Sequence, residues 1–181
     1  MWASEKTAAR RRHAFTLVEV MVATSLLAIL TAAVLSSFIF ILRAERSLAN
    51  YAEMNTQARR FLELLGRDAR SATDVTNTTA TAITMSVPAN LSGTTQAVTY
   101  AYDASAGTVT RSVAGVATVL VKNVSTLTLN FLNSSNTATT SLVELKQVQV
   151  SMHILRTVQQ ATTSEYVISA QYTLRSKAVS H

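Results

Sequence analysis

The chain has no cysteine, and this absence removes several classes of protein at once. A disulfide scaffold, a cysteine-ligated zinc or iron–sulfur centre and a thiol nucleophile are all excluded. Small domains outside the cytoplasm often gain stability from disulfides. Here the hydrophobic core must hold the fold by itself.

Proline and glycine are also scarce, with one proline and four glycines. The proline is Pro88, so no proline falls between Phe15 and Ala72. Because proline removes a backbone N–H and clashes with the preceding turn, its absence permits a long unbroken helix. We predict one continuous helix over this segment.

Residues that carry chemistry are few and scattered. The three histidines, His13, His153 and His181, form no H-E-x-x-H pattern, and no G-x-S-x-G motif is present. Because the chain is rich in serine, many Ser–His153–Asp combinations can be imagined. No particular catalytic triad is therefore indicated. His153 falls on the polar face of its expected strand and is predicted to be solvated. The sequence predicts no enzyme activity, no catalytic residue, no metal site and no cofactor, and Asp103 with Ser105 indicates a turn rather than a calcium site.

A long apolar segment is the most informative feature present. Between Phe15 and Leu42, Glu19 is the only side chain that is charged at neutral pH. About 20 apolar residues suffice to cross a membrane as a helix. A charge at mid-membrane costs roughly 2.5–3.5 kcal/mol on insertion scales, so an ionisable residue there indicates a function.

The residues before this segment form a basic leader, residues 1–14. Its basic side chains outnumber its one acid, Glu5; they are Lys6, Arg10, Arg11 and Arg12. Basic flanks remain on the cytoplasmic side, so we expect a single pass with the N-terminus inside. An ordinary signal peptide has a shorter apolar core followed by a cleavage site. Here the distinct boundary precedes the apolar segment, between Ala14 and Phe15.

Residues 10–30, RRRHAFTLVEVMVATSLLAIL, resemble the N-terminal signature of type IV prepilins and type II secretion pseudopilins. In that family a basic leader and a small residue, usually glycine, precede Phe-Thr-Leu-Val-Glu and an apolar helix. Phe15 to Glu19 match this pattern at every position. Ala14 departs from the usual glycine, which bears on how efficiently the site is processed.

The resemblance implies a sequence of events. A membrane prepilin peptidase would cleave after Ala14 and N-methylate the new terminus at Phe15. The subunit would lie in the lipid of the bacterial inner membrane, with its body on the periplasmic side. An inner-membrane assembly platform would then add it to a helical fibre of other pilin or pseudopilin subunits.

Glu19 has an expected role in that assembly. Cleavage leaves a positive amine on Phe15 within the apolar layer. Two opposite charges about 4 Å apart attract by about 4 kcal/mol at an effective dielectric near 20, which is similar to the insertion penalty. The amine of one subunit could therefore pair with Glu19 of its neighbour. Pairing with the amine of the same subunit, and an unpaired Glu19, are the two alternatives.

Beyond Leu42 the helix is expected to become amphipathic, over residues 43–72. Apolar residues recur at spacings of three and four, which predicts one buried helix face; they are Leu48, Tyr51, Met54, Ala58, Phe61, Leu62, Leu65 and Ala69. The arginines of this segment alternate with acids.

Residues 73–181 change to a composition rich in threonine, serine and valine. Alternation of apolar and polar residues predicts half-buried antiparallel strands around Val98–Tyr102, Leu127–Phe131, Val148–Ile154 and Tyr166–Leu174. Asp103–Gly107 is expected to be a hairpin turn, and Gly93 and Gly115 mark further turns. Residues 133–141 are expected to form a polar loop. The fold class is therefore α+β: a long N-terminal helix, half membrane-embedded and half amphipathic, packed on a small antiparallel β body.

The predicted function is that of a minor pilin or pseudopilin that primes or tips a fibre. The body is most similar to W-type minor pilins and J-type minor pseudopilins, and it lacks the C-terminal disulfide of many pilins. The alternatives are a subunit of a competence or adhesion pilus, a DNA- or surface-binding module at a fibre tip, and an anchored protein that is not processed. The net charge is +6, and the leader supplies +3 of it (four bases minus Glu5). The interleaved charges elsewhere favour a solvated surface over a nucleic-acid partner.

Overall fold

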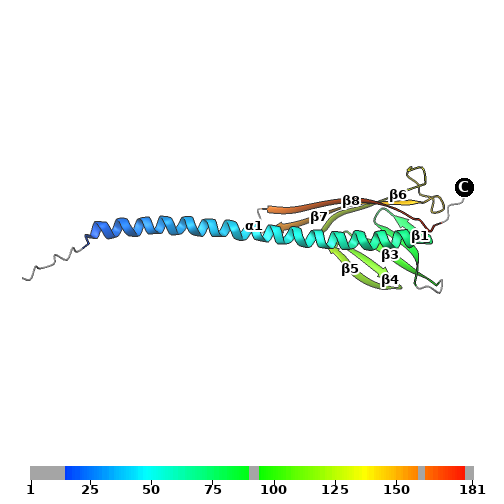
Figure 1. Cartoon of the computed structure of the whole chain (residues 1–181), viewed down its shortest axis with the longest axis horizontal. Helices are drawn as coiled ribbons and strands as arrows, with labels where there is room; N and C mark the ends of the chain where they lie inside the picture. Colours follow the sequence, from blue (N-terminus) through cyan, green and yellow to red (C-terminus); the bar gives the residue numbers. More distant parts are fainter. Residues whose placement is uncertain (1–14, 90–93, 159–161, 178–181) are drawn as a thin grey trace, which may run out of the picture. The chain divides into compact units, whose positions relative to one another are not determined.

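The computed structural model describes residues 15–89, 94–158 and 162–177, and these form a long helix followed by strands (Figure 1). The helix is α1 (Leu17–Ser71). The strands of the described residues are β1 (Asp74–Thr79), β2 (Ala82–Pro88), β3 (Thr95–Asp103), β4 (Thr108–Val113), β5 (Val116–Lys122), β6 (Val124–Leu132), β7 (Gln147–Val158) and β8 (Thr162–Thr173). The chain divides into two compact units, residues 1–44 and 45–181.

The start of α1 has an identifiable local cause, and its last residue bonds back to the preceding turn. At its start the backbone N–H of Glu19 donates to Thr16 Oγ1 at 3.2 Å, so Thr16 acts as the N-cap. At its end the Ser71 hydroxyl donates to the carbonyl of Arg67 at 3.0 Å. The helix is continuous between these points, which confirms the predicted single helix to within two residues at either end.

The strands form two antiparallel sheets. The first has the order β1-β2-β3-β4-β5, so each strand pairs with the one that follows it, and the second has the order β6-β7-β8. The predicted turns lie at Gly107 (φ 60°) and Gly115 (φ 88°), and both adopt the left-handed backbone that glycine accommodates. Gly93 lies outside the described residues. The predicted α+β architecture is confirmed, and the division into two sheets is a feature that the alternation pattern did not indicate.

The core of the body lies between one face of α1 and both sheets. The helix residues that are buried there follow the predicted spacing: Met54, Ala58, Phe61, Leu65 and Ala69. Leu48 and Tyr51 share that spacing but are 69% and 41% exposed, so the prediction that they are buried is wrong. The five-stranded sheet is bonded to the helix at Gln57, whose Oε1 accepts the backbone N–H of Lys122.

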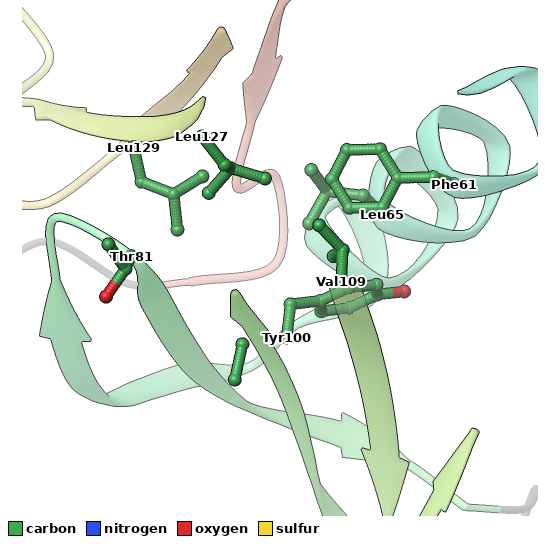
Figure 2. Close-up of a pocket in the computed structure, with 8 residues that line it drawn as sticks. Phe61, Leu65, Thr81, Tyr100, Val109, Leu127 and Leu129 are labelled. Atoms are coloured by element: carbon green, nitrogen blue, oxygen red, sulfur yellow. The ribbon is translucent and has the colours of Figure 1, made fainter. Parts of the chain in front are cut away.

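A small apolar cavity remains where the three layers meet (Figure 2). Figure 2 shows Leu127 and Leu129 of β6 on one side and Phe61 of α1 on the other. Its volume of about 10 Å³ is close to that of one water probe, far below the roughly 300 Å³ at which small-molecule pockets begin. This cavity is a packing gap in the core and not a ligand site.

Gly66 allows a close contact between α1 and β8. A Cβ added at Gly66 would lie 2.6 Å from Tyr172 Cε1, and the Tyr172 hydroxyl donates to the carbonyl of Leu62 at 3.0 Å. We expect Gly66→Ala to destabilise the body by about 1–2 kcal/mol, because overpacking costs about 1–3 kcal/mol and exceeds the helix-propensity gain of about 1 kcal/mol. Thermal unfolding followed by near-UV circular dichroism measures this. If the close contact is the cause, combining Gly66→Ala with Tyr172→Leu should remove most of the added penalty; a more stable single variant would contradict it.

Candidate functional site

The first part of α1 presents apolar side chains to its surroundings throughout. All residues from Leu17 to Leu42 are exposed. Among the described residues, α1 is a helix long and apolar enough to cross a membrane, with a mean hydropathy of 2.5 over its most apolar window. Burying so many aliphatic and aromatic side chains requires lipid or other helices. This finding agrees with membrane anchoring.

The hydroxyl groups within this segment are accommodated by its own backbone. Thr24 Oγ1 donates to the carbonyl of Val20 at 3.0 Å, and Ser37 Oγ donates to that of Ala33 at 3.0 Å. Ser25 and Thr31 make similar bonds to the preceding turn. These groups therefore enter an apolar layer without losing a hydrogen-bond partner. Glu19 differs from them, because nothing in the described residues bonds to its carboxylate.

Glu19 lies one helical turn from Phe15, on the same side of the helix. Both residues line a shallow groove on the surface of α1, whose other residues are Val20, Ala23, Thr24 and Leu27. Phe15 is 80% exposed and precedes the first helical residue. The structure thus brings together the predicted methylation and assembly residues. Ala14, the other residue of the predicted cleavage site, lies outside the described residues together with the rest of the leader.

Thr16 caps the start of α1, a local role that the sequence analysis did not single out. Thr16 and Glu19 have the T-x-x-E spacing of a capping box, in which the first residue accepts from the N–H of the fourth. This spacing was the available signal. Glu19 therefore has a local role at the positive end of the helix dipole in addition to any role in assembly. The two roles use different atoms of Glu19, since the cap uses its backbone N–H and docking would use the charge of its carboxylate.

A buried ionic cluster fixes the far end of α1 to the five-stranded sheet. Asp68 is 2% exposed, and its Oδ2 accepts from the Tyr100 hydroxyl at 2.7 Å and from Arg111 Nη2 at 2.7 Å. Arg111 Nε also donates to Asp68 Oδ2 at 2.8 Å, and Arg67 Nε to Oδ1 at 3.2 Å. Burial and the adjacent Asp68 raise the pKa of Tyr100. Burial is the largest single effect and opposes the charge on Arg111, but the interactions with Asp68 and Tyr100 together outweigh it and raise the pKa of Arg111. Because Asp68 and Arg111 are paired with opposite charges, the cluster holds α1 and the five-stranded sheet together.

Ser125, His153 and Glu165 form a hydrogen-bonded row across β6, β7 and β8. Ser125 Oγ lies 3.0 Å from His153 Nδ1, and His153 Nε2 contacts the Glu165 carboxylate. The sequence predicted a solvated His153, but the structure shows that both of its ring nitrogens contact other side chains. Ser125 Oγ also lies within hydrogen-bond distance, 3.1 Å, of the carbonyl of His153. The row consequently links three strands.

The turn at Asp103 has the predicted form. Asp103 Oδ1 accepts from the backbone N–H of Ser105 at 2.9 Å and from that of Ala106 at 3.1 Å. The Ser105 hydroxyl donates to the same oxygen at 2.6 Å. The Ser105 hydroxyl and these backbone bonds lower the pKa of Asp103. The carboxylate is thus occupied within its own turn.

Comparison with family models matches residues 9–35 to the prokaryotic N-terminal methylation motif. A search among curated proteins found no significant match. The matched segment contains Ala14, Phe15 and Glu19 and extends into the exposed part of α1. It supports a subunit similar to type IV pilins and pseudopilins. The motif implies processing by a prepilin peptidase and assembly with other pilin subunits.

Proposed function

We propose that this chain is a minor pilin or minor pseudopilin that primes or tips a helical fibre. In this role it is a structural subunit without catalysis, in a type IV pilus or a type II secretion system. The observation that carries the proposal is the methylation motif at residues 9–35 at the head of an exposed apolar helix. The same helix ends as the core helix of an antiparallel β body.

Each part of the chain has a task in this proposal. The leader and the apolar segment hold the precursor in the inner membrane. Removal of residues 1–14 frees the Phe15 amine, which then pairs with Glu19 of a neighbouring subunit. The body stays outside the membrane, where its core and the Asp68 cluster stabilise it without disulfides. The lack of cysteine supports the minor role, because many main pilins close their exposed C-terminal region with a disulfide.

Leader cleavage is the direct test. Co-expression with a prepilin peptidase should yield a membrane-extracted chain that begins at Phe15 and carries one added methyl group, as read by intact-mass spectrometry. Ala14→Gly should be processed at least as fast as the parent chain, because glycine is the usual residue there. Ala14→Phe should block processing, since the site requires a small residue. A mature terminus inside the apolar segment, for example after Ala33, would indicate an ordinary signal peptidase and refute the proposal.

A further inference from the structure

Strand β8 presents a long open edge. It is the outer strand of the three-stranded sheet and extends over Thr162–Thr173. On the side away from β7, its backbone groups have no partner within the described residues. Natural edge strands are often protected by lysine, proline or short length. The sequence of β8 has no lysine or proline, and Glu165 is its only charge.

Strand β5 presents a second open edge at the far side of the five-stranded sheet. Its outward edge bonds within the described part of the chain only at its last residue, where the N–H of Lys122 donates to Gln57 Oε1. The first four residues of β5, 116–119, are exposed, including Val116 at 72% and Val119 at 46%, whereas Leu120 and Val121 are buried. By contrast, the outer edge of β6 is partly occupied, because the N–H of Leu129 donates to the carbonyl of Ala80 at 2.8 Å.

The two open edges flank α1 and run in opposite directions along it. From its start to its end, β8 contacts successively later turns of the helix: Tyr166 bonds to Asn55, and Tyr172 bonds to Leu62. It therefore runs parallel to α1. Strand β5 runs the other way. Its last residue bonds to Gln57, whereas Thr118 pairs with Arg111, which reaches Asp68. Figure 1 shows β8 and β5 on opposite sides of this part of α1.

Copies of this chain with parallel helices would thus bring β8 of one beside β5 of the next in antiparallel orientation. A two-fold β8–β8 contact would instead make the helices of the two bodies antiparallel, which does not fit subunits that share one orientation in a fibre. The side chains also fit. Glu165 lies near the start of β8, and the exposed Lys122 lies at the end of β5, so antiparallel pairing brings opposite charges together. Val167, 60% exposed, would face the valines of β5.

We propose that β8 of one copy pairs edge to edge with β5 of a second copy and joins their sheets along the fibre. This inference rests on the proposed function, because the shared orientation of subunits in one fibre is what aligns the two edges. The occupant of each edge is a second copy of the same chain. The pairing gives β-strand hydrogen bonds between bodies in addition to the contacts between apolar helices.

The absence of cysteine makes the test direct. Two differently tagged full-length chains are co-expressed in membranes with a prepilin peptidase. One carries Ser169→Cys on β8, and the other carries Ala117→Cys, Thr118→Cys or Val119→Cys on β5. The matched control is Asn77→Cys, an exposed position on β1, the other edge strand of the five-stranded sheet. A disulfide requires Cα atoms within about 7 Å, so mild oxidation reports which strands adjoin.

We expect a mixed disulfide between Ser169→Cys and at least one β5 position, and none with Asn77→Cys. Adding Val167→Lys and Val119→Lys should weaken this crosslink by up to about fivefold, and Val167→Lys with Val119→Glu should restore it. Loss of every β5 crosslink, preference for Asn77→Cys, or a Ser169→Cys homodimer would each overturn the pairing. The N-terminal mass of the same samples reports separately on the proposed function, since a chain processed at Phe15 without a β5 crosslink refutes the pairing alone.

Discussion

Asp68→Ala is expected to destabilise the β body by about 3–5 kcal/mol, a large effect for a single polar change. The substitution removes the acceptor of both Tyr100 and Arg111 and leaves the guanidinium partly buried without a counter-charge. An uncompensated buried charge costs far more than the net value of the ion pair it came from. The loss should therefore exceed what a deleted surface carboxylate produces.

The measurement is urea unfolding of the full chain in detergent micelles, followed by near-UV circular dichroism of the tyrosines. The matched control is Glu63→Ala, which removes an exposed acid from the same helix and should change stability by less than about 0.5 kcal/mol. Equal losses in the two variants would show that Asp68 acts only through overall charge.

A second variant separates the ion pair from simple packing. Asp68→Leu combined with Arg111→Met and Tyr100→Phe replaces the whole cluster by apolar groups. Such replacements of buried ionic clusters are often neutral or stabilising, so the triple variant should recover most of the loss. If the triple variant is as unstable as Asp68→Ala, the cluster stabilises the body through the shape of its side chains and not through the pairing of their charges.

Local sequence patterns predicted the long helix and half of the strands. The helix followed from proline-free spacing of apolar residues, and β3, β6, β7 and β8 from alternation. Strand β5 shows no such alternation, because a register shift opposite Val109 and Thr110 breaks its pairing with β4 and its first residues are exposed. A bulge changes which face a side chain occupies, so the period of two is lost.

The Asp68 cluster is a set of contacts that local sequence patterns cannot predict. Asp68 stands 32 residues from Tyr100 and 43 from Arg111, and no spacing rule relates them. Only the folding of β3 and β4 against α1 brings them together. At the candidate site the opposite holds, because Phe15, Thr16 and Glu19 are neighbours on one helical turn. Their relation follows from helix geometry alone, which is why the motif could be interpreted directly.

Glu19→Gln should remove the subunit from fibres by more than about tenfold while leaving insertion and leader cleavage intact. Insertion becomes easier without the charge. Glutamine keeps the size of the side chain and the backbone N–H that Thr16 caps, but it cannot neutralise the Phe15 amine of a neighbour. At an effective dielectric near 20 that attraction is worth about 4 kcal/mol, so a tenfold loss, about 1.4 kcal/mol, requires only part of it. The measured quantity is the ratio of subunit in sheared fibres to subunit in the membrane.

Thr16→Ala is the matched control for this prediction, because it removes the cap and keeps the charge. The Glu19 N–H loses its acceptor, which costs about 0.5–2 kcal/mol at the helix start, yet the Phe15 amine still finds its carboxylate. We therefore expect Thr16→Ala to assemble and Glu19→Gln not to. The reverse result would show that Glu19 matters as part of a helix cap and not as a docking charge.

The position of the subunit in the fibre changes this expectation in one respect. The first subunit of a fibre has no neighbour ahead of it, so its own Glu19 has no incoming amine to receive, whereas its Phe15 terminus still must be freed by cleavage. A subunit at the tip should therefore tolerate Glu19→Gln and fail with Ala14→Phe. A subunit within the shaft should fail with both. Fibre counts for the two variants, each supplied as the sole copy of the chain, distinguish a tip position from a shaft position.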